Sequence, residues 1–172
     1  TFDEAYRKHV GLHGVPKVIV IVDDMVGTGQ SLAANISKFH DSNLTVLTSD
    51  GPLVLAFALL ATSEGQETML RELAKLSHDR MDFRAGEILD ESASLFAEPK
   101  GVFTSVEERD RAKALALDIG ASIYKNAPLG FGGQSLSVVF PTTVPNNCLP
   151  LLHSRGKGTK AQWRPLFERL VN

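Results

Sequence analysis

Residues 18–32 read VIVIVDDMVGTGQSL, and this stretch decides the fold. Its β-branched run at 18–22 is typical of a strand that is buried on both faces of a parallel sheet. Leu32, Ile36 and Phe39 then recur at helical spacing, which predicts a helix over 30–40. A strand, a short glycine-containing turn and a helix in this order indicate one unit of an α/β sheet.

The same alternation continues along the chain. Strands are predicted at 53–61, 83–89 and 135–140, and helices at 63–76, 106–119 and 163–170. Ser63 with Gln66, and Ser105 with Glu108, have the spacing of capping boxes at two helix starts. We therefore expect an α/β fold with a doubly wound, mostly parallel sheet, which binds ligands beyond the carboxyl ends of its strands.

The helix predicted over 106–119 has one apolar face. The residues that share this face are Val106, Ala112, Leu115 and Ile119. Gly120 follows them and is a natural stop for the helix.

Size and composition restrict the class of protein. The chain has 172 residues, of which 43% are apolar and 22% charged, and this suits one domain with a sizeable core. The net charge of −2 predicts no bulk attraction to nucleic acid or membrane, and the apolar run at 52–61 is too short to span a bilayer. Cys148 is the only cysteine, so no internal disulfide forms, which fits a reducing cytoplasm. We expect a single cytoplasmic domain over 1–172, with 145–172 as its C-terminal extension.

The loop after the first strand has the chemistry of an anion site. Gly27 and Gly29 allow consecutive backbone N–H groups to turn inward as a nest. Thr28 and Ser31 add hydroxyl donors, and the following helix points its positive N-terminus at the same place. A phosphate monoester fits such a loop.

Asp23 and Asp24 stand directly before this loop, where they would repel a phosphate. Slightly further away, they would accept hydrogen bonds from vicinal hydroxyls or help to hold a hydrated Mg²⁺. A phosphate in the loop and a diol on the acids together describe a ribose 5-phosphate.

The stretch resembles the phosphoribosyl-pyrophosphate motif of type I phosphoribosyltransferases, which have a Rossmann-like fold. The resemblance implies that Asp23 and Asp24 contact the ribose hydroxyls as catalytic acids and that Mg²⁺ accompanies the substrate. Gly27 stands where that family usually has threonine. The residues that would wrap the 5-phosphate are Met25, Val26, Gly27, Thr28, Gly29, Gln30 and Ser31.

A second resemblance covers the last quarter of the chain. PLGFGGQSLSVVFPTTVPNNCLPLLH at 128–153 and WRPLFERL at 163–170 look like the C-terminal part of a bacterial family of phosphoribosyltransferase-like proteins. That family is associated with conflict and antiphage systems, including retrons. The resemblance implies an antiphage effector whose partners include a reverse transcriptase, retron DNA or another defence protein.

Two further groups of polar residues have a functional and a structural interpretation. Asn146 and Asn147 would read a base or second substrate, or would simply form a turn after Pro145. The acidic residues Glu87, Asp90 and Glu91 would act as a general base or Mg²⁺ site, or as solvated loop and cap residues. We assign no metal ligand directly.

Other interpretations of the opening stretch remain. It lacks the lysine of a Walker A loop and, at Leu32, the third glycine of a dinucleotide fingerprint. An ordinary turn with one aspartate as a helix cap is one alternative. An S-adenosylmethionine-dependent methyltransferase is another, with Glu64 as the acid that holds the ribose, although Thr28 and Ser31 then have no evident task.

The resemblance to type I enzymes also implies elements that precede the ribose-phosphate strand. These are a loop that grips pyrophosphate and a mobile lid, whereas only TFDEAYRKHVGLHGVPK at 1–17 comes before the strand here. We therefore expect an incomplete domain with its N-terminal portion missing. With that portion supplied, glycosyl transfer or nucleotide cleavage is expected; without it, the expectation is a non-catalytic nucleotide-sensing or assembly module.

Overall fold

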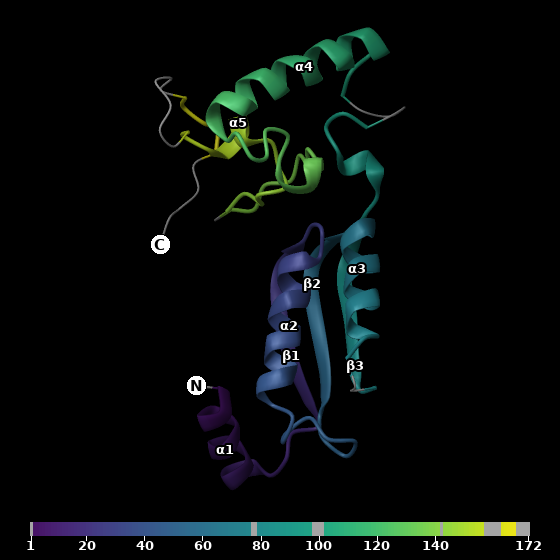
Figure 1. The fold of residues 1–172 in the computed structure, drawn as a ribbon, viewed down its shortest axis with the longest axis vertical. Coiled ribbons are helices and arrows are strands. Elements are labelled where there is room, and N and C mark those ends of the chain that lie inside the picture. The colour runs from purple at the N-terminus through teal and green to yellow at the C-terminus, as the bar shows by residue number, and fades with distance from the viewer. Residues whose placement is uncertain (1, 77–78, 98–101, 142, 157–162, 168–172) are drawn as a thin grey trace. The chain divides into compact units, whose positions relative to one another are not determined.

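The computed structural model describes residues 2–76, 79–97, 102–141, 143–156 and 163–167 (Figure 1). It divides into two compact units, Thr1–Ile88 and Leu89–Asn172, and each is described by itself. The elements of the first are α1 (Phe2–His13), β1 (Val18–Val26), α2 (Gln30–Ser42), β2 (Leu53–Thr62), α3 (Ser63–Leu73) and β3 (Met81–Leu89). Those of the second are η1 (Glu91–Ala93), α4 (Val106–Ile123), η2 (Phe131–Gly133) and α5 (Pro150–His153).

The first unit is built on a three-stranded sheet in the order β1-β2-β3. β1 and β2 pair in parallel from Val18 opposite Leu53 to Val26 opposite Ala61. Helix α2 connects β1 to β2 and helix α3 connects β2 to β3, which is the crossover that parallel strands require. The predicted α/β class with a parallel sheet is therefore confirmed.

The core of the first unit lies between one face of the sheet and the two connecting helices. The buried residues that form it are Val26, Leu32, Ala33, Ile36, Ala56, Ala58, Ala61, Met69, Leu73 and Phe83. Several positions on β2 are alanine, and a small side chain lets a helix approach the sheet closely. This packing places the start of α2 beside the end of β1, and the start of α3 directly after the end of β2.

The other face of β1 is exposed. Val18, Val20 and Val22 retain 45%, 53% and 67% of their accessible surface, and Leu59 on β2 retains 53%. Among the described residues, both connecting helices pack on the opposite face. In a doubly wound sheet helices cover this face as well. The expectation that β1 is buried on both faces is therefore wrong for the described residues.

Some boundaries in this unit differ from the prediction. β1 continues to Val26, so the two aspartates lie within the strand. The cap of α3 is Thr62 rather than Ser63, because the Thr62 side chain accepts the hydrogen bond from Gly65 N–H. α3 ends at Leu73 instead of continuing to residue 76. Helix α1 was not among the predicted helices. Within the described residues, no helix combines the length and apolar character needed to cross a membrane.

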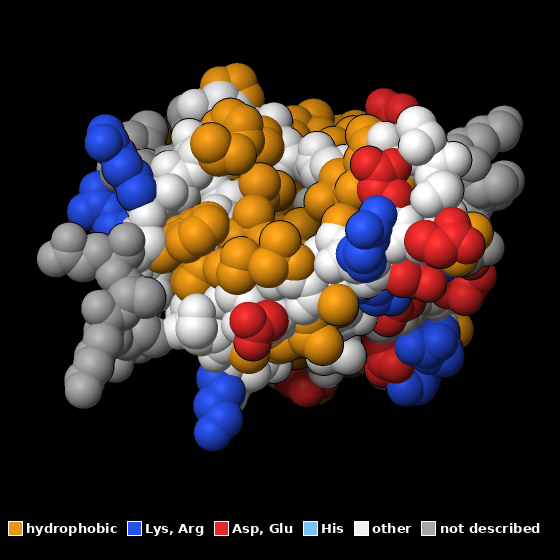
Figure 2. Space-filling view, turned by 90° about the horizontal axis from the view of Figure 1, so that it is seen from above, with side chains coloured by type: hydrophobic (Ala, Val, Ile, Leu, Met, Phe, Trp, Pro, Cys, Tyr) orange, Lys and Arg blue, Asp and Glu red, His pale blue; other side chains and the backbone are white. Residues whose placement is uncertain are grey.

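In the second unit, the start of α4 agrees with the prediction and its apolar face does not. Ser105 Oγ accepts the N–H of Glu108, which is one half of a capping box. The Glu108 carboxylate accepts the N–H and hydroxyl of Thr104 instead of the N–H of Ser105. The buried residues are Ala116, Gly120 and Ile123, whereas Leu115 is 60% exposed. In Figure 2, which is seen from above, most acidic side chains lie toward one end of the visible face, basic ones lie toward both ends, and apolar ones lie over its middle.

Gly120 does not stop α4, which continues to Ile123. A Cβ at Gly120 would lie 2.0 Å from the carbonyl oxygen of Pro128. The loop after α4 therefore folds back onto the helix at this residue, and the packing surface follows the glycine instead of the larger leucines.

The strand predicted at 135–140 is wrong. Leu136 makes isolated bridges to Ser94 and Cys148, but no strand forms. Ser135, the first residue of the predicted strand, has φ 50°, a conformation outside the β region, and residues 137–140 form no bridge to another segment among the described residues. The terminal helix predicted over 163–170 is also wrong at 163–167, which are not helical; its remaining residues lie outside the described part.

Candidate functional site

The candidate site is the junction of β1 and α2. Gly29 is the N-cap of α2 and has φ 77°, a left-handed conformation that favours glycine. Within the described residues, no side chain caps α2, in contrast to α3 and α4, which are capped by Thr62 and Ser105. Because the first N–H groups of a helix have no partner inside it, this N-terminus is available to an anion.

The two aspartates of β1 lie on opposite faces of the strand, because successive side chains alternate. Asp24 shares the exposed face with Val22. Asp23 lies on the partly covered face, and its Oδ1 accepts the N–H of Asp24 at 2.9 Å. Burial raises the pKa of the Asp23 carboxyl, and the neighbouring Asp24 carboxyl raises it further. Asp24 is therefore the more exposed of the two carboxylates.

The residues expected to wrap a phosphate fall into three groups. Met25 and Val26 belong to β1, and Val26 is buried in the core. Gly27, Thr28 and Gly29 form the turn and are buried, with Thr28 only 6% exposed. Gln30 and Ser31 open α2 and are exposed. Side-chain contacts to a ligand would come from the last pair, and the turn would contribute mainly backbone groups.

The turn is supported by α3, a feature that the sequence reading missed. The hydroxyl of Thr62 donates to the carbonyl oxygen of Gly27 at 2.6 Å and accepts the N–H of Gly65 at 3.0 Å. A threonine before a helix is itself an N-cap signal. Its second bond, to a residue distant in sequence, has no local signature, and only the packing reveals it.

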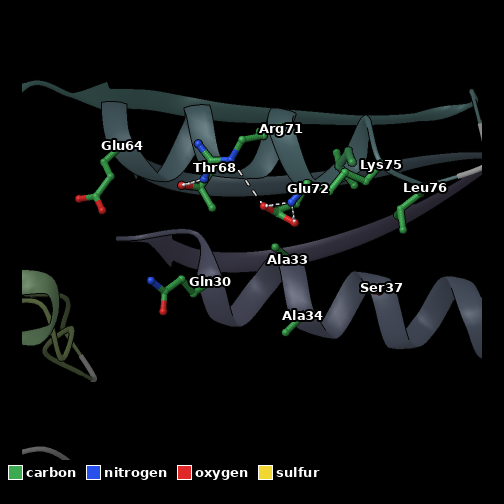
Figure 3. Close-up of a pocket in the computed structure, with 11 residues that line it drawn as sticks. Gln30, Ala33, Ala34, Ser37, Glu64, Thr68, Arg71, Glu72, Lys75 and Leu76 are labelled. Carbon is green, nitrogen blue, oxygen red and sulfur yellow. Dashed lines mark hydrogen bonds and ion pairs between the residues drawn. The ribbon is translucent and has the colours of Figure 1, made fainter.

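A groove of about 570 Å³ runs between α2 and α3 from this junction (Figure 3). Gln30 and Glu64 lie at its end nearest the turn. Further along, Lys75 pairs with Glu72 at 2.7 Å, and Arg71 also lies within 3.5 Å of the Glu72 carboxylate. Both basic side chains thus contact one carboxylate, so the groove has a mixed charge and would accept a polar extension of a ligand held at the turn.

The second candidate loop has a structural role at Asn147. Its side-chain amide donates to the carbonyl oxygen of Phe131 at 3.2 Å, and its own carbonyl accepts the N–H of Leu136. Asn147 is buried, which supports the interpretation as a turn former. The side chain of Asn146 is exposed.

The acidic residues after β3 include one clear cap. Asp90 is the N-cap of η1 and accepts the N–H of Ser92 at 2.9 Å, whereas Glu87 and Glu91 are exposed. Among the described residues, no group of three or more His, Cys, Asp or Glu side chains is arranged to hold a metal ion. The exposed Asp24 carboxylate fits Mg²⁺ in the way this ion usually binds, through one or two carboxylates together with phosphate oxygens of a substrate.

A comparison with known proteins identifies the family of the chain. The model of the PRTase-CE family matches residues 2–169, which is nearly the whole chain. No curated protein and no solved structure matches the chain. The chain therefore belongs to the PRTase-CE family, a phosphoribosyltransferase-like family.

Proposed function

We propose that the chain binds a ribose 5-phosphate compound, either phosphoribosyl pyrophosphate or a nucleotide, together with Mg²⁺. The observation that carries this proposal is the N-terminus of α2, which has no side-chain cap and adjoins a left-handed glycine at the end of β1. Family membership supports the same class of ligand.

In this proposal the phosphate lies against the backbone N–H groups at Thr28, Gly29 and Gln30, with the Ser31 hydroxyl as a further donor. Asp24 accepts hydrogen bonds from the ribose hydroxyls. Asp23 carries a partly buried charge and orients the strand end through its bond to the Asp24 N–H. A bound Mg²⁺ would neutralise phosphate charge near these acids.

Glycosyl transfer is the proposed reaction. An acceptor would form a bond to ribose C1 as the bond from C1 to the pyrophosphate oxygen breaks, and both electrons of that bond would leave with the Mg²⁺-bound pyrophosphate. Asp24 and the turn would hold the sugar in position for this step. In the cleavage of a nucleotide, water would form the bond to C1 and lose a proton, while the base would leave with both electrons of its bond to C1 and take up a proton; the sugar would be held in the same way.

A non-catalytic nucleotide-sensing or assembly module is the second candidate. The burial of Gly27, Thr28 and Gly29 favours it, and the Gly27 carbonyl oxygen and Gly29 lie close to Gly65 of α3. A role in bacterial antiphage defence, with a reverse transcriptase and retron DNA or another defence protein as partners, rests on the resemblance of the C-terminal segments alone. Methyl transfer from S-adenosylmethionine is the third candidate.

Calorimetric titration with phosphoribosyl pyrophosphate and Mg²⁺ tests the proposal. We expect binding by the unchanged protein and at least a tenfold weaker affinity in Asp24→Asn, because the amide lacks the negative charge and one of the two acceptor oxygens of the carboxylate. Asp50→Asn, an exposed acid before β2, is the matched control and should bind normally. Absence of binding, or equal binding by both variants, contradicts the proposal. Pyrophosphate release that requires Asp24 would separate the enzyme from the sensing module.

A further inference from the structure

The contacts between α3 and the turn have a consequence for the turn's conformation. The Thr62 hydroxyl makes two hydrogen bonds. It donates to the Gly27 carbonyl oxygen at 2.6 Å and accepts from the Gly65 N–H at 3.0 Å. Thr62 is 7% exposed, so water does not compete freely for this hydroxyl. These two hydrogen bonds connect the loop at residues 27–29 to the N-terminus of α3.

The bond fixes the direction of one peptide group. In a trans peptide the carbonyl oxygen of one residue and the N–H of the next point in opposite directions. Because the Gly27 carbonyl is directed at Thr62, the N–H of Thr28 is directed away from α3. In the proposed function the Thr28 N–H is one of the donors to the phosphate. If this peptide rotated, its carbonyl oxygen would face the phosphate instead and repel it.

Glycine at position 27 makes such a rotation easy, since it has no Cβ to resist it. Close packing leaves little room for it. A Cβ at Gly65 would lie 2.3 Å from the Gly27 carbonyl oxygen and 2.6 Å from that of Val26. A Cβ at Gly29 would lie 2.8 Å from the carbonyl oxygen of Gly65. The first turn of α3 therefore presses directly on the backbone of the turn.

We infer that Thr62 is a positioning residue that, with Gly65, holds the Gly27–Thr28 peptide with its N–H available to a phosphate. This deepens the proposed function and rests on it, because a phosphate at the turn is the ligand whose binding the orientation serves. The role requires the hydroxyl of Thr62, and serine supplies it equally well.

The test compares Thr62→Val, which keeps the shape and removes the hydroxyl, with Thr62→Ser, which keeps the hydroxyl. Amide hydrogen exchange across residues 26–31 and the affinity for ribose 5-phosphate are measured on the intact protein. We expect Thr62→Val to exchange at least tenfold faster in this segment and to bind at least tenfold more weakly. Thr62→Ser should stay within about threefold of the unchanged protein in both.

Val54→Ala is the control for a general loss of stability, since Val54 is buried in the same sheet and does not contact the turn. It should lower the melting temperature and leave the affinity unchanged. Unchanged exchange in Thr62→Val, or equal loss in Thr62→Ser, overturns the inference. If the unchanged protein binds no ribose phosphate, the proposed function fails, and the exchange comparison still decides whether Thr62 holds the turn.

Discussion

Asp23 and Asp24 are neighbours in sequence, but β1 gives them different environments. Asp24 is exposed, whereas Asp23 accepts a backbone N–H and is partly covered. The pKa of Asp23 is raised by burial first and by Asp24 second. The strand therefore separates two residues that the sequence pattern treats as a pair, and it makes one of them the more costly to ionise.

This difference predicts a pH-dependent effect of Asp23→Asn. A carboxyl with a raised pKa binds more protons in the folded state than in the unfolded state, so stability falls as pH rises from the ordinary value of 3.8 through the raised pKa. We expect Asp23→Asn to unfold at a higher temperature than the unchanged protein at pH 7. The difference should vanish at about pH 3, where both states are protonated.

Thermal unfolding followed by circular dichroism at several pH values measures this effect. Asp50→Asn, at an exposed acid before β2, is the matched control for replacing a carboxylate by an amide. If Asp23→Asn is less stable at pH 7, the charged carboxylate stabilises the strand end, and the account of Asp23 is wrong.

At the scale of elements, the junctions between helices and neighbouring backbone depend on glycine. Gly65 and Gly120 lie inside helices, where glycine is unfavourable by about 1 kcal/mol relative to alanine. Each touches a carbonyl oxygen at a distance that excludes a Cβ. The contact with a distant segment explains why the less favourable residue is used.

Gly120→Ala tests this explanation, because two effects of opposite sign compete. Helix propensity alone would stabilise α4 by about 1 kcal/mol. A Cβ placed 2.0 Å from the Pro128 carbonyl oxygen should cost about 1–3 kcal/mol of overpacking and win. We expect lower protection of the α4 amides in hydrogen exchange. Ala121→Gly, at an exposed neighbour, should cost about 1 kcal/mol from propensity alone. Greater protection in Gly120→Ala would contradict the close approach.

At the scale of the whole molecule, the first unit buries one face of its sheet and leaves part of the other exposed. Val54 on β2 is 1% exposed, whereas Val22 on β1 is 67% exposed. Truncation should therefore act very differently at these two valines. We expect Val54→Ala to lower the free energy of unfolding by about 2 kcal/mol, and Val22→Ala to lower it by less than about 0.5 kcal/mol.

Urea unfolding, monitored by hydrogen exchange of the β2 amides, measures the free energy of unfolding of both variants. If Val22→Ala lowers the free energy of unfolding as much as Val54→Ala does, the exposed face of β1 is covered in solution. That result would conflict with a core on only one face of the sheet.

Part of the fold can be predicted from the sequence alone. β1, β2 and α2 were predictable because continuous apolar runs and helical spacing are local signals. The left-handed conformation of Gly29 was also predictable, since few residues other than glycine adopt it.

Other features depend on contacts that are distant in sequence. The 135–140 segment has the composition of a strand, but it makes only isolated bridges, both at Leu136. The buried face of α4 follows the approach of Pro128, and Thr62 is linked to the candidate site by its bond to Gly27. No local pattern contains this information.

Backbone amide NMR with ribose 5-phosphate tests the central claim most directly, because it locates the phosphate on the chain. The account predicts that the largest shifts occur at Thr28, Gly29, Gln30 and Ser31, that inorganic phosphate produces a weaker version of the same pattern, and that ribose alone shifts chiefly the amides near Asp24. Shifts that leave residues 28–31 unchanged while others respond, or no shift at millimolar ligand, would contradict it.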